Sequence, residues 1–338
     1  MNKAILYLIG VGLMSFTLSM DSLTPRPLEY PDYWPTPLAD FESFPITEEG
    51  FQLGRKLFYD PNLSRDKTIS CASCHSVYNS FTHVDHAVSH GIEGRKGTRN
   101  SPVLVNLAWN ETFHWDGGVN HLDMQPINPL EHTAEMDNEL EVVLSYLNED
   151  TTYQRLFAEV YGDSHVNTKR MLKAIREFTV SLVSSNSKYD QVQRGEAEFS
   201  DQELKGYNLF KQHCNSCHTE PLFNSNMYAN NGLAIDTVYN DLGRFSITQN
   251  ASDSFKFRIP TLRNIEHSYP YMHDGRFRKL REVMEHYASI GKDKPSHLSS
   301  ELTHSFELAP NDQKDLISFM KTLTDLSFLY NREYAFPR

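Results

Sequence analysis

Two five-residue stretches constrain this chain more than any other feature. They are Cys71-Ala-Ser-Cys74-His75 and Cys214-Asn-Ser-Cys217-His218, and both have the form C-x-x-C-H. This pattern is the attachment signature of a c-type haem. The cysteines bond covalently to the porphyrin, and the histidine points its imidazole at the iron as proximal ligand. The sequence therefore predicts two covalent haem c groups, held by Cys71, Cys74, His75, Cys214, Cys217 and His218.

A bare C-x-x-C pattern also occurs in zinc knuckles and in redox pairs of the thioredoxin type. Neither alternative fits this chain. All four cysteines belong to the two motifs, and both motifs carry the immediate histidine. Neither motif follows a strand of the kind that opens a thioredoxin βαβ unit. The repeated motif therefore favours haem attachment.

The length of 338 residues allows two domains, each with its own core and one haem. The segment Gly-x-x-Leu-Phe occurs before each haem motif, at residues 54–58 and 206–210, which indicates two diverged copies of one cytochrome c unit. We predict an N-terminal domain at 47–188 and a C-terminal domain at 189–338, with the boundary in a polar stretch.

Apolar residues recur at helical spacing in several segments, and no alternating strand pattern of any length is present. The chain is therefore expected to be mainly α, with long irregular loops around the haems. The predicted helices are residues 50–59, 138–147, 152–161, 167–183, 201–212, 276–289 and 311–323.

The N-terminus has the composition of a secretory signal. Met1-Asn2-Lys3 carries one positive charge, and the apolar run that follows, 4–18, is short for a spanning helix of ~20 residues. We expect a signal peptide at 1–19 rather than an uncleaved anchor, and a periplasmic location, because c-type haem attachment takes place outside the bacterial cytoplasm. Residues 20–46, rich in Pro, Asp and Tyr, are expected to form an extended arm on the surface.

The formal net charge of -12 and the pI near 5.7 argue against two classes of partner. Nucleic acid and anionic membrane surfaces are both negatively charged and would not attract an acidic protein. We therefore expect no nucleic-acid partner.

Two long loops of the first half contain candidate functional residues. Residues 76–99 contain His83, His86 and His90, each a possible sixth haem ligand, although histidines in such polar loops are more often exposed and structural. Residues 100–136 are dense in aromatics and prolines with almost no helical period. Long ordered loops of this kind are commonly functional.

Besides the haem motifs, several segments match a known family: 98–102, 113–117, Gln125, Pro129, 135–136, 260–264 and 270–275. Through these residues the chain resembles the bacterial dihaem cytochrome c peroxidases over nearly all of its mature length. The resemblance implies that the N-terminal haem reacts with hydrogen peroxide and the C-terminal haem receives electrons from a small periplasmic cytochrome c or a copper protein. It also implies a calcium ion between the domains and allows a homodimer.

The resemblance also assigns roles to single residues. Glu135 would be the acid/base that moves a proton between the two oxygens of peroxide, because hydroxide is a poor leaving group. Gln125 would help to hold the pocket, and Pro129 would pack above the iron. Trp115 matches a tryptophan placed between the two haems, where an oxidisable indole can relay an electron.

Three further residues match the calcium ligands of the family. Asn100 matches the side-chain ligand, and Ser268 and Pro270 match two main-chain carbonyl ligands. The family more often has Thr at the position of Ser268, but a main-chain oxygen tolerates that change. Hard oxygen ligands suit Ca²⁺.

Two departures from the family pattern affect the chemistry. Some members carry a histidine after the first haem motif that blocks the iron at rest; here Ile92 falls at that position, with His90 two places away. We therefore expect a five-coordinate first haem that needs no activation. At the sixth ligand of the second haem, Tyr287 replaces the usual methionine, with Met284 as the alternative and His286 a weaker one. This tyrosine resembles MauG, which oxidises side chains of another protein.

The leading hypothesis is a peroxidase that reduces hydrogen peroxide to water. The alternative is a MauG-type oxidase, which Tyr287 supports; however, the surface tryptophan that MauG uses just before its second haem motif is replaced here by Gln212-His213. A third reading is a dihaem electron carrier. It would need both irons six-coordinate and would leave Gln125 and Glu135 without a purpose.

Overall fold

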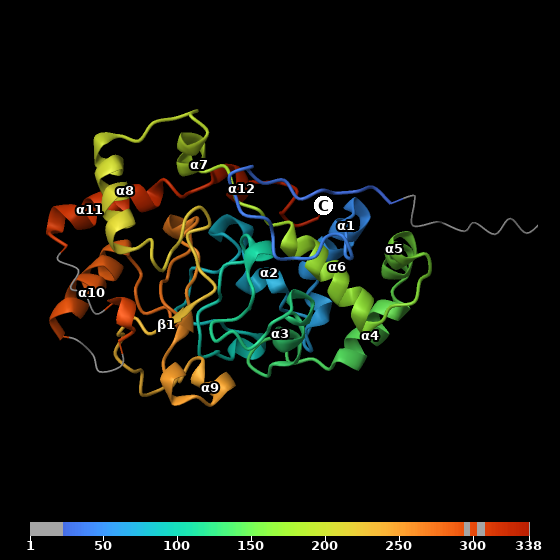
Figure 1. Ribbon diagram of the computed structural model, residues 1–338. Coiled ribbons are helices and arrows are strands. Elements are labelled where there is room, and N and C mark those ends of the chain that lie inside the picture. Colours follow the sequence, from blue (N-terminus) through green and yellow to red (C-terminus); the bar gives the residue numbers. More distant parts are fainter. Residues whose placement is uncertain (1–22, 294–297, 303–307, 338) are drawn as a thin grey trace, which may run out of the picture.

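The computed structural model describes residues 23–293, 298–302 and 308–337 (Figure 1). Within them the chain is mainly helical, which confirms the expected fold class. The predicted signal peptide, 1–19, lies outside the described residues. None of the helices in the described ranges combines the length and the apolar character that a membrane span requires.

The first half is organised by two crossing helices. Helix α1 (Glu48–Phe58) begins at Thr47, whose hydroxyl accepts a hydrogen bond from the Gly50 amide. It packs against α6 (Thr168–Val180), and the backbones approach closely at Gly54, where an added Cβ would lie 1.9 Å from the carbonyl oxygen of Ala174. Helices α4 (Leu140–Glu149) and α5 (Thr151–Tyr161) flank this pair.

The second half repeats this arrangement. Helix α8 (Asp201–His213) packs against α11 (Pro310–Lys321), and an added Cβ on Gly206 would lie 1.9 Å from the carbonyl oxygen of Asp315. The glycine of each Gly-x-x-Leu-Phe segment thus occupies the same kind of contact. Helix α10 (Leu280–Asp293) packs beside α11. In both halves the last long helix crosses the first, as expected for cytochrome c units.

The remaining elements are short and lie in the loops. Strands β1 (Tyr228–Ala229) and β2 (Phe257–Arg258) pair antiparallel, with Tyr228 opposite Arg258. The short α-helices are α2 (Cys71–Cys74), α3 (Ile127–Glu131), α7 (Lys188–Gln193), α9 (Phe245–Thr248) and α12 (Leu326–Leu329). The 3₁₀ turns are Pro61–Leu63, Val77–Asn79, Ile92–Gly94, Leu107–Trp109, Leu122–Met124, Ala251–Asp253, Ile265–His267 and Ser300–Leu302.

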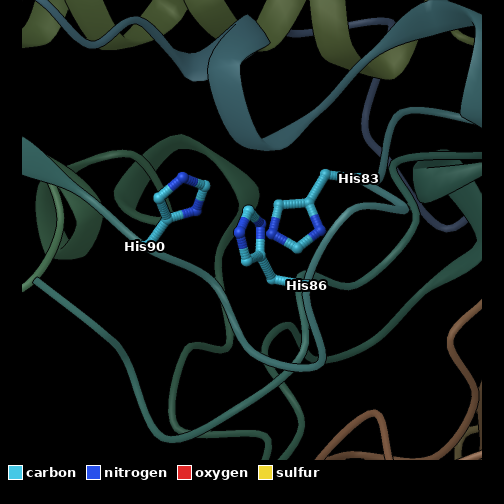
Figure 2. A group of neighbouring side chains, drawn as sticks. All are labelled: His83, His86 and His90. Carbon is cyan, nitrogen blue, oxygen red and sulfur yellow. The ribbon is translucent and has the colours of Figure 1, made fainter. Parts of the chain in front are cut away.

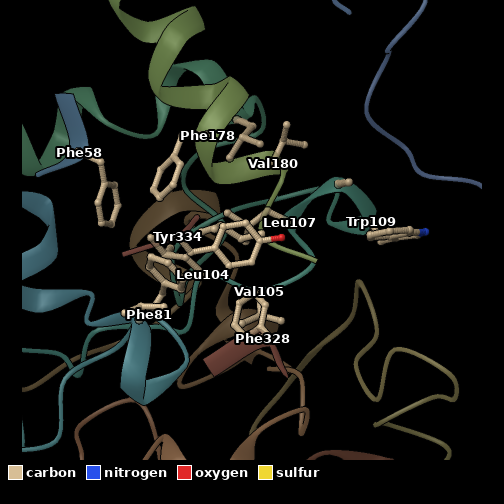
Figure 3. Packing of buried hydrophobic residues seen from close by; sticks show 14 of the residues in the cluster. Phe58, Phe81, Leu104, Val105, Leu107, Trp109, Phe178, Val180, Phe328 and Tyr334 are labelled. Carbon is tan, nitrogen blue, oxygen red and sulfur yellow. The ribbon is translucent and has the colours of Figure 1, made fainter. Parts of the chain in front are cut away.

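The buried hydrophobic side chains form three clusters. One lies between α1, α4, α5 and α6, and a second lies between α8, α10 and α11. The third, here called the aromatic cluster, joins Phe58 and Phe178 of the first half to Phe328 and Tyr334 near the C-terminus (Figure 3). The end of the chain therefore returns to complete the core of the first half (Figure 1).

The N-terminal arm is extended, but it does not lie wholly on the surface. Trp34 is buried, contacts Trp109 edge-on, and lies 4.5 Å from the guanidinium carbon of Arg263. The hydroxyl of Tyr33 donates to Asp190, 2.7 Å away. The expectation of a surface arm was incomplete because its aromatic side chains fill gaps that the helices leave open.

Candidate functional site

The first C-x-x-C-H motif forms the single turn α2, which ends at His75. The His75 Nδ1 donates to the carbonyl oxygen of Phe81 at 2.6 Å, so the lone pair is left on Nε2. A ligating histidine is usually oriented by such a bond from its other ring nitrogen. Burial lowers the pKa of His75 to about 4, so the imidazole is neutral, as a metal ligand has to be. These features fit a haem at this motif.

The second motif follows directly from the C-terminus of α8. The His218 Nδ1 donates to the carbonyl oxygen of Pro260 at 3.0 Å and lies 3.3 Å from that of Phe223. Burial lowers the pKa of His218 to about 4 as well. Both proximal histidines are therefore held neutral, with Nε2 available to a metal.

A large cavity opens beside the second motif. Its volume is about 200 Å³, and its walls are mostly apolar. Cys214, Cys217 and His218 line it, which fits a covalently bound haem.

Both predicted sixth ligands of the second haem, Tyr287 and Met284, line this cavity from α10. Burial raises the pKa of Tyr287 to about 12, and the thiols of Cys214 and Cys217 lie close enough to add to the shift. The weaker candidate, His286, instead places its Nε2 2.9 Å from the carbonyl oxygen of Asn231. The tyrosine ligand stays a prediction.

The predicted acid/base, Glu135, lies beside the first motif. Burial and, after it, the charge of the Glu135 carboxylate raise the pKa of Cys74, and burial raises the pKa of Glu135 itself. Its backbone is fixed by the Ile92 amide, which donates to the Glu135 carbonyl oxygen at 2.9 Å. The backbone at residue 91 passes so close to Glu135 that only glycine fits there, because an added Cβ would lie 2.2 Å from the Glu135 carbonyl oxygen.

Gln125 and Pro129 belong to the same loop as Glu135. Gln125 is half-buried and directly precedes the turn that leads into α3, and Pro129 lies within α3. The Met136 amide donates to the Pro129 carbonyl oxygen at 3.1 Å, which closes the loop around α3. The fold thus places these predicted pocket residues in one compact segment near the first motif.

Trp115 lies at the junction of the two halves. Its indole Nε1 donates to the carbonyl oxygen of Asn100 at 2.8 Å, and its own carbonyl oxygen accepts from the Arg258 amide at 2.7 Å. Its side chain also lines the cavity of the second motif. The ring is therefore held in place against the second haem site by a loop of the first half.

Asn100, Ser268 and Pro270 come together in the wall of the same cavity. The Asn100 Nδ2 lies 2.5 Å from the carbonyl oxygen of Pro270, and the Asn100 backbone amide donates to the carbonyl oxygen of His273 at 2.7 Å. The Oδ1 of Asn100 is buried and has no hydrogen-bond partner among the described residues. An orphaned oxygen beside a carbonyl oxygen fits a hard cation such as Ca²⁺. The calcium site stays a prediction.

The histidines after the first motif differ from the sequence expectation. His83 is buried, His90 is half-buried and only His86 is exposed, and the three rings lie together (Figure 2). The mutual approach of the three rings could not be predicted from the sequence, because the loop has no regular structure from which side-chain direction could be inferred. The same holds for Arg99, whose guanidinium pairs with Asp116 and Asp241 at 2.6 Å and links the halves.

Comparisons with known proteins agree with this geometry. Residues 48–198 match a family model described as di-haem cytochrome c peroxidase. The methylamine utilization protein MauG of Methylorubrum extorquens is 32% identical over 300 residues, which cover 87% of this chain and 82% of that protein. The cytochrome c551 peroxidase of Nitrosomonas europaea is 32% identical over 277 residues, which cover 81% of this chain and 79% of that protein.

A solved structure is also similar. The crystal structure of a MauG-like protein associated with microbial copper homeostasis superposes with a TM-score of 0.84 at 31% sequence identity. The match covers 92% of this chain and 99% of that one, so the similarity extends over both halves.

Proposed function

Because this chain belongs to the di-haem cytochrome c peroxidase and MauG family, we propose that it reduces hydrogen peroxide to water with electrons from a small cytochrome c or a cupredoxin. Family membership makes the chain an oxidoreductase with two haem groups. The donor, the calcium ion and the periplasmic location are parts of our proposal.

The observation that carries the proposal is the position of Glu135 beside the first motif. Reduction of peroxide to two waters consumes two electrons and two protons. Haem iron, when bound at His75, supplies electrons to the O–O bond. The Glu135 carboxylate accepts a proton from one peroxide oxygen and returns it to the other, which then leaves as water. Burial raises the pKa of Glu135, which makes its carboxylate a stronger base.

Trp115 provides the connection to the second haem site. Its indole is fixed by the hydrogen bond to Asn100 and reaches the cavity of the second motif. We propose that electrons delivered at the second haem pass through this ring to the first. A fixed ring keeps the transfer distance constant during turnover.

A second candidate function is the oxidation of side chains in a partner protein, the activity that the resemblance of Tyr287 to MauG implies. Two of the relatives are named methylamine utilization protein MauG. The position of Tyr287 in the second cavity favours it. A phenolate ligand would stabilise oxidised iron and make the second haem a poor acceptor from a mild donor. The replacement of the MauG surface tryptophan by Gln212-His213 argues against the same route here.

Stopped-flow absorbance of the fully ferric protein separates the two candidates. The protein is mixed with hydrogen peroxide and then with a reduced small cytochrome c. We expect rapid reaction of the ferric protein and repeated oxidation of the cytochrome. A long-lived oxidised species that ignores the cytochrome would instead support the protein-oxidising function. Reaction only after half-reduction would show that His90, not Ile92, governs access to the first iron.

A further inference from the structure

Three histidines converge in the loop that follows the first haem motif. His83, His86 and His90 each offer a ring nitrogen, and these nitrogens all lie within 4.8 Å of one another. Figure 2 shows His90 approaching from one side and His83 from the other, with the ring of His86 between them. The ring centroids of His86 and His90 are 4.4 Å apart.

The buried members of this group lack partners. Both ring nitrogens of His83 and the Nδ1 of His90 are buried without a hydrogen bond among the described residues. His83 keeps only 5% of its surface exposed. Buried polar atoms are nearly always paired with protein, water or an ion. Several orphaned nitrogens that face one another therefore indicate a ligand that binds nitrogen donors.

The backbone fixes two of the three histidines and leaves the third adjustable. Next to His83, the Thr82 hydroxyl donates to the carbonyl oxygen of Ser101 at 2.5 Å, and an isolated antiparallel β-bridge pairs Thr82 with Ser76. His90 is held by its own bridge to Lys96. His86 lies in the bend between these anchors and is exposed. A loop of this kind can close around an ion by moving one side chain.

The second half also supports this loop. Gly275 approaches so closely that an added Cβ would lie 1.9 Å from the carbonyl oxygen of Ala87. The Arg278 guanidinium donates to the carbonyl oxygen of Val84 at 3.2 Å. The histidine group is therefore built where the two halves of the molecule meet.

The ligand chemistry narrows the choice of ion. Neutral imidazoles suit Zn²⁺ and Cu²⁺, whereas Ca²⁺ and Mg²⁺ require oxygen ligands. A tetrahedral zinc ion with Zn–N bonds of about 2.0–2.1 Å holds its nitrogens roughly 3.4 Å apart, so a modest rotation of the rings would suffice. Three protein ligands leave the fourth position to water or another small ligand.

From this geometry we propose that His83, His86 and His90 form a binding site for one divalent transition-metal ion of the Zn²⁺ or Cu²⁺ type. The site lies beside the first haem motif, where the carbonyl oxygen of His90 is 3.6 Å from Cys74 Sγ, but it uses none of the residues that we expect to hold the haems or the calcium ion. It does not depend on the peroxidase function.

Metal binding is tested on the untagged holoprotein, stripped with chelator and kept in excess Ca²⁺. Equilibrium dialysis against Zn²⁺, with elemental analysis for zinc and iron, should give one zinc for every two irons. His86→Ala, which removes the exposed ligand, should weaken this binding by about 100-fold, because only two imidazoles remain. His165→Ala, at another exposed histidine, serves as the matched control and should bind as the parent protein does.

Binding of Cu²⁺ allows the ligand atoms to be identified by spectroscopy. The Cu²⁺-loaded protein should show nitrogen superhyperfine splitting in its electron paramagnetic resonance spectrum, and the splitting should be simplified in His86→Ala. Equal zinc binding by the His86 and His165 variants would overturn the proposal. So would a first haem that changes from low-spin to high-spin in metal-free His90→Gln, since His90 would then belong to the haem iron.

Discussion

The position of Glu135 distinguishes the two predicted haem sites. Its carboxyl group lies beside the first motif, whereas no carboxylate is among the described residues that line the cavity of the second. A site without a proton carrier can pass electrons but cannot easily convert a peroxide oxygen into water. This asymmetry supports peroxide chemistry at the first haem and electron entry at the second.

Replacing Glu135 by Gln should remove the proton carrier and keep the shape of the side chain. We expect the peroxidase turnover number to fall by about 10²–10⁴-fold, with haem content and the absorption spectrum unchanged. Steady-state oxidation of a reduced small cytochrome c measures the effect. Glu131→Gln, an exposed position in α3, is the control and should keep its activity. A Glu135 variant of normal activity would remove this residue from the mechanism.

Trp115→Phe tests the relay between the haems. Phenylalanine is much harder to oxidise and cannot donate to Asn100. We expect the ferric protein to react with peroxide at a normal rate, while oxidation of the second haem slows by at least about tenfold, the effect of ~1.4 kcal/mol in the barrier. Rapid-mixing spectroscopy resolves the two steps. Trp109→Phe, in the aromatic cluster, should not slow the second step, and equal slowing would indicate a packing effect.

At the scale of elements, each half depends on one close helix crossing. Gly54 in α1 and Gly206 in α8 are the points where the partner backbone leaves no room for a side chain. Each glycine lies one or two turns before a haem motif or the loop that leads to it. The crossing therefore sets the direction from which the chain enters each haem site.

Gly54→Ala and Gly206→Ala should each separate the crossing helices. Overpacking of this kind costs about 1–3 kcal/mol of unfolding free energy, and the new Cβ would also contact backbone that cannot rotate away. Thermal unfolding of the holoprotein should show a lower midpoint for both variants. Gly118→Ala provides the comparison, because its nearest neighbour is the flexible end of Ile247, 3.0 Å away. A similar drop in the unfolding midpoint of all three variants would show that the helix crossings are not what makes Gly54 and Gly206 necessary.

Helix α7 is anchored by a buried ion pair. Asp190 accepts two hydrogen bonds of 2.8 Å from Arg263, and both side chains are fully buried. Burial alone would raise the pKa of Asp190, but the hydrogen bonds and charge of Arg263 outweigh it and lower the pKa. The ionised form is thus preferred in the folded state, and this preference stabilises the fold only while Asp190 is charged.

Asp190→Asn should therefore destabilise the protein in a pH-dependent way. At neutral pH, loss of one partner of a buried pair costs about 3–5 kcal/mol of unfolding free energy. The stabilisation is complete above the ordinary Asp pKa of about 3.9 and is lost as the pH falls through the lower pKa of the folded state. The midpoints of parent and variant, measured by thermal unfolding, should converge in acid. Asp32→Asn, at an exposed position, should show no such convergence.

The elements show how far the sequence could predict the fold. Helices with a clear apolar period, such as α1, α5 and α8, were predicted to within a few residues. By contrast, α7 was not predicted, and a polar domain boundary was expected there. The helix lacks an apolar pattern because its buried side chains include Asp190, whose partner Arg263 lies 73 residues away. Strands β1 and β2 have two residues each and leave no pattern. Such elements depend on tertiary contacts.

On the scale of the whole molecule, the junction between the halves contains much of the predicted chemistry. Trp115, Asn100 and Pro270 are linked by hydrogen bonds across it, and Arg99 pairs with Asp241 of the second half. The haem attachment residues are predicted from the motif alone. The histidine group and the salt bridges of Arg99 could not be predicted, since they join residues that only the folded chain brings together.

Removal of calcium should loosen this junction. Chelation leaves the buried Asn100 Oδ1 without a partner, so the thermal midpoint should fall and should recover with added Ca²⁺. An ion at 100 times its dissociation constant contributes about 2.7 kcal/mol. Asn100→Ala should abolish the response. Asn110→Ala, which loses a different bond across the junction, to Asn224, should retain it; absence of any calcium response in the parent protein would rule out the site.

The return of the C-terminal end to the aromatic cluster makes the core of the first half depend on the last residues of the chain. Phe328 and Tyr334 complete a core that Phe58, Phe81 and Phe178 begin. Chains are made from the N-terminus, so this core stays open until the last residues have been added. Cys71 packs against the same cluster. The core beside the first haem motif is therefore complete only when the C-terminal residues are in place.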